Sequence, residues 1–193
     1  MQAVQSKTTY MALAGLFAAL TAICSWISIP LGFTPVPMNL ATLAVFLAGG
    51  LLGAKYGAIS LTVYGLVGAV GAPVFAGFRG GLSVLAGPTG GFIIGYIAAA
   101  FVVGAVVSAA FKQRERTGAS AKPSLRLPLT IAAGLVAGLL ACYALGTAWF
   151  MVSTNTGFMP ALLACVVPFL PGDAIKIIAG TLLIKKLRKH VSR

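Results

Sequence analysis

The sequence predicts an all-α integral membrane protein with six transmembrane helices, both termini cytoplasmic, in a single membrane domain of residues 1–193. Three observations predict this class. Hydrophobic residues make up 59% of the 193 residues and charged residues only 8%, the mean hydropathy is +1.01, and the charges gather between long apolar segments. Because a soluble domain carries about 25% charged residues, the composition argues against a soluble enzyme, a disordered chain and a nucleic-acid-binding module.

Six apolar segments approach the length of a membrane span, which needs roughly 20 apolar residues. The first is too long for the apolar part of a signal peptide and lacks a clear cleavage site. The second is short, so a half-helix is an alternative there. In chain order, the predicted spans are Tyr10–Ile29, Asn39–Ala54, Tyr56–Val74, Gly90–Phe111, Leu129–Val152 and Pro160–Ile184.

Basic residues delimit these spans on one side of the membrane. Six alternating spans bring four basic segments to the same side, and basic loops are typical of the cytoplasmic side. The net charge of +12 is therefore interpreted as a topology signal that also attracts anionic lipid, without nucleic acid as a partner. The basic residues that support this are Lys7, Lys55, Lys112, Arg114, Arg116, Lys122, Arg126, Lys185, Lys186, Arg188, Lys189 and Arg193.

The opposite ends of the spans are joined by the predicted outer loops Pro30–Met38, Phe75–Thr89 and Ser153–Met159, in which Arg79 is the only charged residue. Prolines stiffen the first loop. The second loop is rich in glycine yet apolar, which predicts that it folds back over a cavity, with a simple turn as the alternative.

Small residues recur at four-residue spacing, which lets helices approach closely in lipid. Gly49, Gly53 and Gly57 form one such row and are expected to pack internally. In the first span, the row consists of Ala14, Ala18 and Ala22. That alanine face either packs internally or docks a partner membrane subunit. The three cysteines lie in apolar spans and are interpreted as small buried residues.

Asp173 and Lys176 carry the strongest chemical signal, because charges inside a span are costly. Their three-residue spacing places them on one face of a helix, and Pro168, Pro171 and Gly172 loosen that helix just before them. An internal ion pair is one interpretation. The other is a ligand site in which the carboxylate accepts N–H groups and the ammonium donates to a carbonyl, as an amide- or urea-like group requires.

Four further side chains are candidates for the same site. Arg79 suits an anionic group such as a carboxylate, or contacts lipid phosphate. Asn39 is favoured as a helix cap over a ligand contact. Tyr143 and Phe150 share a helix face and either wall a pocket or pack, and Trp149 is expected at the membrane interface.

The chemistry-bearing residues are few. Glu115 and Asp173 are the only carboxylates and His190 the only histidine, and the sequence holds no G-x-x-x-x-G-K-[ST] stretch. We therefore expect no catalysis, cofactor or metal, and any use of ATP is expected from another chain. An integral-membrane enzyme and a pore-forming oligomer are the alternatives; they would require several acidic or histidine residues, or a polar stripe along one helix.

Four segments together resemble the BioY family, the biotin-specific substrate-binding (S) components of energy-coupling-factor (ECF) vitamin transporters. They are TPVPMNLATLAVFLAGGLLG (Thr34–Gly53), APVFAGFRGGLSVLAGPTGG (Ala72–Gly91), YALGTAWF (Tyr143–Phe150) and PFLPGDAIK (Pro168–Lys176).

The resemblance implies a multi-pass protein of a bacterial or archaeal plasma membrane that binds biotin and mediates its uptake, with a transmembrane coupling protein and two ATPase subunits as partners. It also implies that Asp173 and Lys176 bind the ureido ring and that the alanine face of the first span docks the coupling protein. Further ligand contacts are expected from Arg79, Asn39, Tyr143, Gly80 and Gly81.

Overall fold

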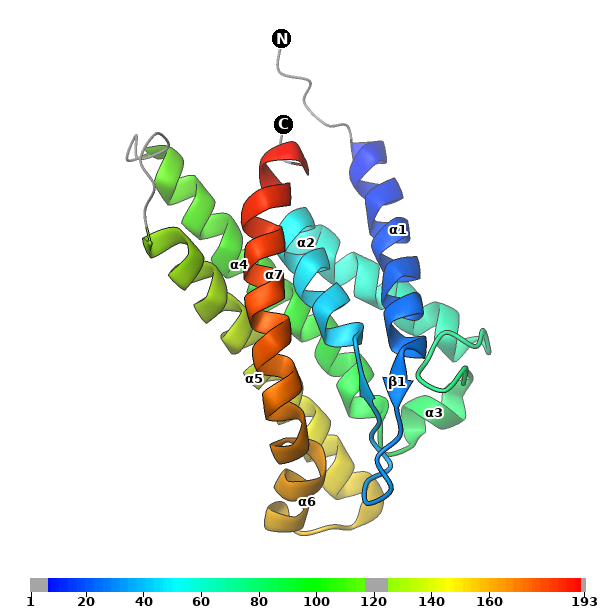
Figure 1. The fold of residues 1–193 in the computed structure, drawn as a ribbon. Coiled ribbons are helices and arrows are strands. Elements are labelled where there is room, and N and C mark those ends of the chain that lie inside the picture. Colours follow the sequence, from blue (N-terminus) through cyan, green and yellow to red (C-terminus); the bar gives the residue numbers. More distant parts are fainter. Residues whose placement is uncertain (1–6, 117–124, 192–193) are drawn as a thin grey trace.

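A computed structural model describes residues 7–116 and 125–191, the latter without the side chains of residues 189–191, and it is built almost entirely from helices (Figure 1). Lys122 and Arg193 lie outside the described residues, as does the side chain of Lys189. The helices are α1 (Lys7–Trp26), α2 (Ala41–Ala69), α3 (Leu82–Ala86), α4 (Gly90–Arg116), α5 (Arg126–Thr154), α6 (Phe158–Cys165) and α7 (Leu170–Val191). A 3-10 turn, Val167–Phe169, joins α6 to α7, and the short strands β1 (Ser28–Ile29) and β2 (Met38–Asn39) pair antiparallel.

Among the residues that the structure describes, five helical segments are long and apolar enough to cross a membrane: Lys7–Trp26, Ala41–Ala69, Gly90–Arg116, Arg126–Thr154 and Phe158–Arg188. They account for the six predicted spans, because the second and third form the two halves of α2. The two halves meet at Gly53, whose φ of 82° and ψ of 177° are not helical. A positive φ is inexpensive only for glycine, so the break occurs where the sequence permits it.

The sixth predicted span is interrupted as its prolines predict. Pro168 lies in the 3-10 turn and Pro171 in the first turn of α7. Proline donates no backbone hydrogen bond and disfavours helix in the residue before it. The interruption places Asp173 in the first turn of α7, where the carboxylate also benefits from the positive end of the helix dipole.

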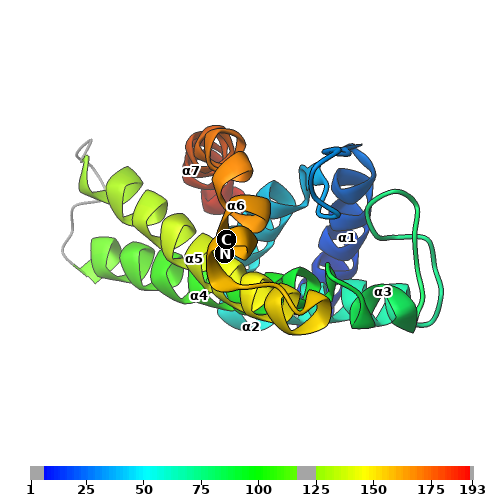
Figure 2. The same ribbon diagram turned by 90° about the horizontal axis from the view of Figure 1, so that it is seen from below.

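The first half of α2 lies between α1 and α7, while α4, α5 and the second half of α2 form a row behind them (Figures 1 and 2). Glycines make this close approach possible, as predicted for the row that contains Gly49. A Cβ added there would lie 2.4 Å from the Ala100 carbonyl oxygen of α4, and one added at Gly104 would lie 2.3 Å from the Ala54 backbone nitrogen.

The basic segments gather at one end of the molecule. Tyr10 at the start of α1 stacks on Tyr56, just after the break in α2, with ring centroids 4.9 Å apart. The end of α4, the start of α5 and the end of α7 lie at the same end (Figure 1). This arrangement agrees with the predicted clustering; which side of the membrane this end faces stays a prediction.

Arg188 is one of the basic residues that delimit the last span, and the structure gives it an additional role within the fold. Its side chain is buried: Nη1 donates to the Gly50 carbonyl oxygen at 2.6 Å and Nη2 to the Ser108 hydroxyl at 2.8 Å. The guanidinium carbon also lies 4.8 Å from the centroid of the Phe111 ring. Gly50 lies three residues before the break at Gly53, so the arginine donates to a carbonyl at the end of the first half of α2.

The alanine face of α1 is not a free docking surface, contrary to that expectation. Ala14, Ala18 and Ala22 are 2%, 8% and 6% exposed, because α1 packs on α2 through them. The alternative interpretation, internal packing, is therefore correct. The outward side of α1 carries Gly15 and Ala19 instead, together with large apolar residues such as Leu16.

Candidate functional site

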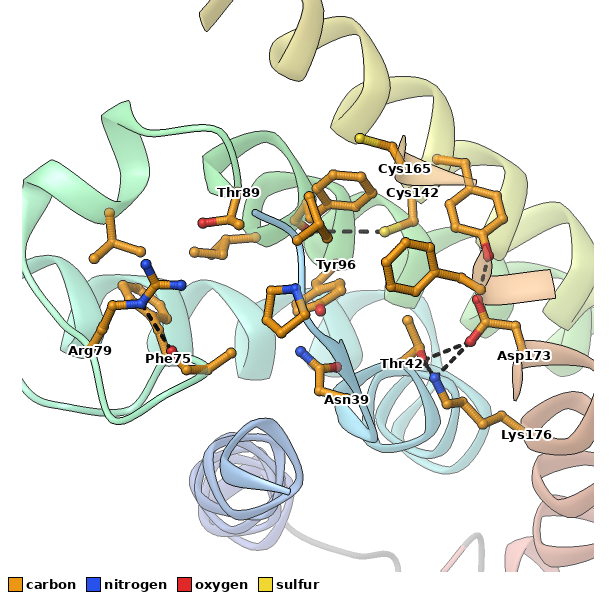
Figure 3. A pocket seen from close by; sticks show the side chains of 18 residues that line it. Asn39, Thr42, Phe75, Arg79, Thr89, Tyr96, Cys142, Cys165, Asp173 and Lys176 are labelled. Carbon is orange, nitrogen blue, oxygen red and sulfur yellow. Dashed lines mark hydrogen bonds and ion pairs between the residues drawn. The ribbon is translucent and has the colours of Figure 1, made fainter. Parts of the chain in front are cut away.

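The molecule contains a cavity that we call the inner cavity (Figure 3). Its empty space, with the open solvent at its mouth included, is about 680 Å³. It lies at the end of the fold opposite Arg188, between the first turns of α2, α4 and α7, the middle of α5, and the segments 36–39 and 75–84. The residues that line it are Val36, Pro37, Asn39, Thr42, Phe75, Ala76, Arg79, Val84, Thr89, Phe92, Ile93, Tyr96, Cys142, Tyr143, Cys165, Phe169, Asp173 and Lys176.

Asp173 and Lys176 form an ion pair at one end of this cavity. The Lys176 Nζ lies 2.7 Å from Asp173 Oδ1, and the two residues are 7% and 2% exposed. The predicted shared helix face is thus confirmed. The internal ion pair and the ligand-site interpretation are compatible, because both side chains line the cavity as well as contacting each other.

Two side chains from other helices complete this end of the cavity. Tyr143 of α5 donates its hydroxyl to Asp173 Oδ2. Thr42 of α2 accepts a hydrogen bond from Lys176 Nζ at 2.9 Å and donates to Asp173 Oδ1 at 3.3 Å. Both carboxylate oxygens and the ammonium are therefore held by α2 and α5, which stabilises two charges that burial alone would disfavour.

Tyr143 lies in the cavity wall, which is one of the two roles considered for it. Phe150, seven residues further along α5, is buried outside the cavity and packs in the core. Asn39 is not the N-cap residue of α2, which is Leu40 and forms no side-chain cap hydrogen bond. The Asn39 Oδ1 accepts a hydrogen bond from the Ala41 backbone N–H at 3.0 Å just before the helix, and the side chain lines the cavity. Trp149 lies outside the cavity and ties α5 to the end of α3 by donating to the Gly87 carbonyl at 3.0 Å.

Arg79 lies at the other end of the inner cavity from Asp173 and Lys176 (Figure 3). Its backbone carbonyl accepts from Phe75 N–H at 2.9 Å, and its Nε donates to the Ala76 carbonyl at 3.2 Å. Phe75 itself is buried against Tyr64, with centroids 5.5 Å apart, so part of the apolar outer loop does fold inward. This anchor brings an exposed cation to the cavity mouth.

Gly80 and Gly81 do not line the cavity. A Cβ at Gly80 would lie 2.3 Å from the Ala72 carbonyl oxygen, and Gly81 has a φ of 99° at the start of α3. They shape the loop that carries Arg79, because no other residue fits their conformation or space.

Several lining residues were not predicted, among them Thr42, Phe92, Tyr96 and Phe169. Thr42 lies three residues after Asn39 in the Thr34–Gly53 segment. That spacing indicates that the two side chains face the same side, so Thr42 could have been predicted from Asn39. Phe92 and Tyr96 come from α4, where nothing in the local sequence distinguishes them from ordinary core residues.

The arrangement suits an elongated, mostly apolar ligand with polar ends. The Asp173–Lys176 end offers an acceptor beside a donor, aromatic rings line the middle, and Arg79 offers a cation at the mouth. Within residues 7–116 and 125–191, no three His, Cys, Asp or Glu side chains gather in a way that would hold a metal ion.

Comparisons with known proteins agree on one family. Residues 1–193 match the model of the BioY family. The chain is 38% identical to a biotin transporter BioY from Rhodobacter capsulatus, covering 92% of each chain. It is 42% identical to a biotin transporter BioY from Thermotoga maritima, covering 91% of this chain and 94% of that one.

A solved structure has the same fold. It is the S-component for biotin from an ECF-type ABC transporter, and it matches with a TM-score of 0.78 and 27% identity over 98% of this chain and 95% of its own.

Proposed function

The chain belongs to the BioY family, and from that premise we propose that it is a multi-pass membrane protein that binds biotin and mediates its uptake as the S component of an ECF-type transporter. Its family and relatives are transporter components rather than enzymes. The observation that carries the proposal is the buried Asp173–Lys176 pair in the wall of the inner cavity.

Biotin presents the groups that this cavity complements. Its ureido ring has two N–H donors and one carbonyl, its thioether ring and alkyl chain are apolar, and its tail ends in a carboxylate. The ureido N–H groups bind the carboxylate of Asp173, and the ureido carbonyl accepts from Lys176. Aromatic side chains such as Tyr96 and Phe92 cover the apolar part, and Arg79 meets the tail carboxylate.

Ligand binding at the Asp173 end does not start from a vacant carboxylate. Tyr143 donates to Oδ2, while Lys176 and Thr42 both donate to Oδ1. A carboxylate accepts about four hydrogen bonds, so one position on Oδ2 is available to a ligand N–H group. A second ligand N–H group replaces the 3.3 Å bond from Thr42 and leaves the ion pair intact. Because the acceptor is held in place beforehand, little ordering is left for the binding step.

Energy for uptake comes from partners in this proposal. The sequence holds no phosphate-binding loop of the G-x-x-x-x-G-K-[ST] type, so two ATPase subunits supply ATP hydrolysis through a transmembrane coupling protein. The basic end of the molecule faces the cytoplasm and the inner cavity opens outward. The outward side of α1, with Gly15 and Ala19, is the surface we assign to the coupling protein, because small residues permit close helix approach.

Binding of radiolabelled biotin to the purified chain in detergent, without ATP or partners, tests the proposal. We expect saturable binding that unlabelled biotin displaces. Uptake by cells should require co-expression of the coupling protein and ATPases. A monodisperse, folded sample without saturable binding would contradict the function and would favour the membrane-enzyme or pore alternatives.

A further inference from the structure

A second hollow, which we call the outer chamber, adjoins the inner cavity at Arg79. It is an open depression with about 540 Å³ of empty space, the open solvent at its mouth included. Three residues line both spaces: Pro37, Ala76 and Arg79. The chamber therefore continues from the end of the inner cavity that receives the ligand's tail in the proposed function.

The walls of the outer chamber come from the two outer loops. Besides the three shared residues, the chamber is lined by Ser28, Pro30, Thr34, Pro35 and Gly77. Proline fixes its own φ and restricts the residue before it, and the Thr34 hydroxyl accepts from the Val36 N–H at 3.3 Å. The first loop is thus pre-shaped around an opening instead of collapsing onto Arg79.

Arg79 has hydrogen-bonding capacity for more than one kind of tail. A guanidinium carries five N–H donors. In the described part of the chain, the bond from Nε to the Ala76 carbonyl is the one hydrogen bond the structure gives its side chain. A carboxylate uses two of the remaining donors, whereas an amide carbonyl uses one, so replacing the carboxylate by an amide weakens this contact without removing it.

We propose that the outer chamber accepts an extension beyond the carboxyl carbon of the ligand, so that N-substituted biotin amides such as biotinyl-lysine are bound as well as free biotin. The inference rests on the proposed function. The bicyclic ring occupies the Asp173–Lys176 end, the amide carbonyl accepts from Arg79, and the added chain lies between Ser28 and Gly77. Among the described residues, Arg79 is the one charged side chain that lines the chamber, so an extension that carries a carboxylate suits the chamber best.

Competition against radiolabelled free biotin tests this. Free biotin, the primary amide of biotin and biotinyl-lysine are titrated against the parent chain, and we expect biotinyl-lysine to compete within about tenfold of free biotin and better than the primary amide. The variants Ser28→Trp and Pro30→Trp each fill the outer chamber. They should weaken competition by biotinyl-lysine at least tenfold and change free-biotin affinity less than twofold.

Ile29→Trp is the matched control. Ile29 is 63% exposed, does not line the chamber and follows Ser28 in the same strand, where successive side chains point to opposite faces. It should leave both ligands unaffected. Ser28 pairs with Asn39 across the strands, so a loss of free-biotin binding in Ser28→Trp would reflect damage to that pairing. In that case the result for Pro30→Trp tests the outer-chamber inference.

The outcomes separate this inference from the function. Failure of free biotin to bind the parent chain overturns the proposed function. Binding of free biotin without competition by biotinyl-lysine overturns only the outer-chamber inference, as does an equal loss of both ligands in Pro30→Trp.

Discussion

Tyr143 donates its hydroxyl to the Asp173 carboxylate oxygen that Lys176 does not contact. The two donors come from different helices and leave the carboxylate oriented toward the inner cavity, where it also lines the wall. A carboxylate with this arrangement acts only as an acceptor, so its chemical identity matters more to a ligand than its volume.

The first prediction concerns that identity. Asp173→Asn keeps the volume but turns an NH₂ donor toward the ligand's N–H groups. A hydrogen bond to a charged group contributes about 1.5–3 kcal/mol, and 1.4 kcal/mol is about tenfold in affinity. We expect biotin affinity to fall at least tenfold in equilibrium binding. Parent-like affinity in a folded Asp173→Asn sample would contradict the assignment.

The second prediction separates the structural role of the ion pair from its role in binding. Lys176→Met leaves Asp173 buried without its cation, and breaking a buried pair on one side costs about 3–5 kcal/mol. The double variant Asp173→Asn with Lys176→Met removes the charge as well. Thermal unfolding in detergent should show the double variant to be more stable than Lys176→Met alone, while neither binds biotin well. If the double variant is the less stable of the two, the pair does not have this structural role.

The third prediction concerns Arg79. Biotin should compete better than its primary amide against labelled biotin on the parent chain, because the carboxylate makes a charge-assisted contact with the guanidinium. Arg79→Ala should remove most of this preference, because it weakens binding of free biotin more than binding of the amide, which loses a single uncharged contact. A preference that persists in Arg79→Ala would place the carboxylate elsewhere.

The fourth prediction compares two sides of α1. Ala14→Leu and Ala18→Leu overpack the contact with α2 and should destabilise the protein by about 1–3 kcal/mol. Gly15 has no atom within 4 Å of an added Cβ and Ala19 is exposed, so Gly15→Leu and Ala19→Leu should leave stability and biotin binding unchanged. Only the latter pair should lower biotin uptake in cells that contain the partners. Normal uptake by both would move the coupling-protein contact away from α1.

The fifth prediction concerns Arg188. Arg188→Met leaves the Gly50 carbonyl without its partner, which costs about 1–3 kcal/mol for a buried group. Lys186→Met, exposed in the same turn of α7, removes the same charge without that loss and is the control. We expect a lower midpoint of thermal unfolding for Arg188→Met than for Lys186→Met. Equal midpoints would mean that the contact contributes nothing to stability.

The sequence predicts this fold well where a residue's role depends on its own chain neighbours. The Asp173–Lys176 spacing, the interruption of the helix at Pro168 and Pro171, and the close packing at Gly49 follow from local periodicity and backbone chemistry. The break at Gly53 lies two residues before Lys55, the charged residue that separates the second predicted span from the third.

The sequence predicts less where a role depends on which helices meet. Thr42 and Tyr96 enter the site because the starts of α2 and α4 converge there, and periodicity does not say which face of an apolar helix will turn inward. The same limit explains Ala14, since an alanine face suits a neighbour within the chain as well as a partner. The role of Arg188 could not be predicted from its own segment, because its hydrogen-bond acceptor, the Gly50 carbonyl, lies beside the break in another helix.

The contact between Arg188 and Gly50 also bears on how the chain is made. The two residues are 138 positions apart, so the ribosome completes the first half of α2 long before the arginine exists. Each half of α2 is shorter than the roughly 20 residues that a span requires, and the Gly50 carbonyl lacks the donor that Arg188 provides until α7 is synthesised. The contact that joins the end of α7 to the break in α2 therefore forms only after the last helix has been made.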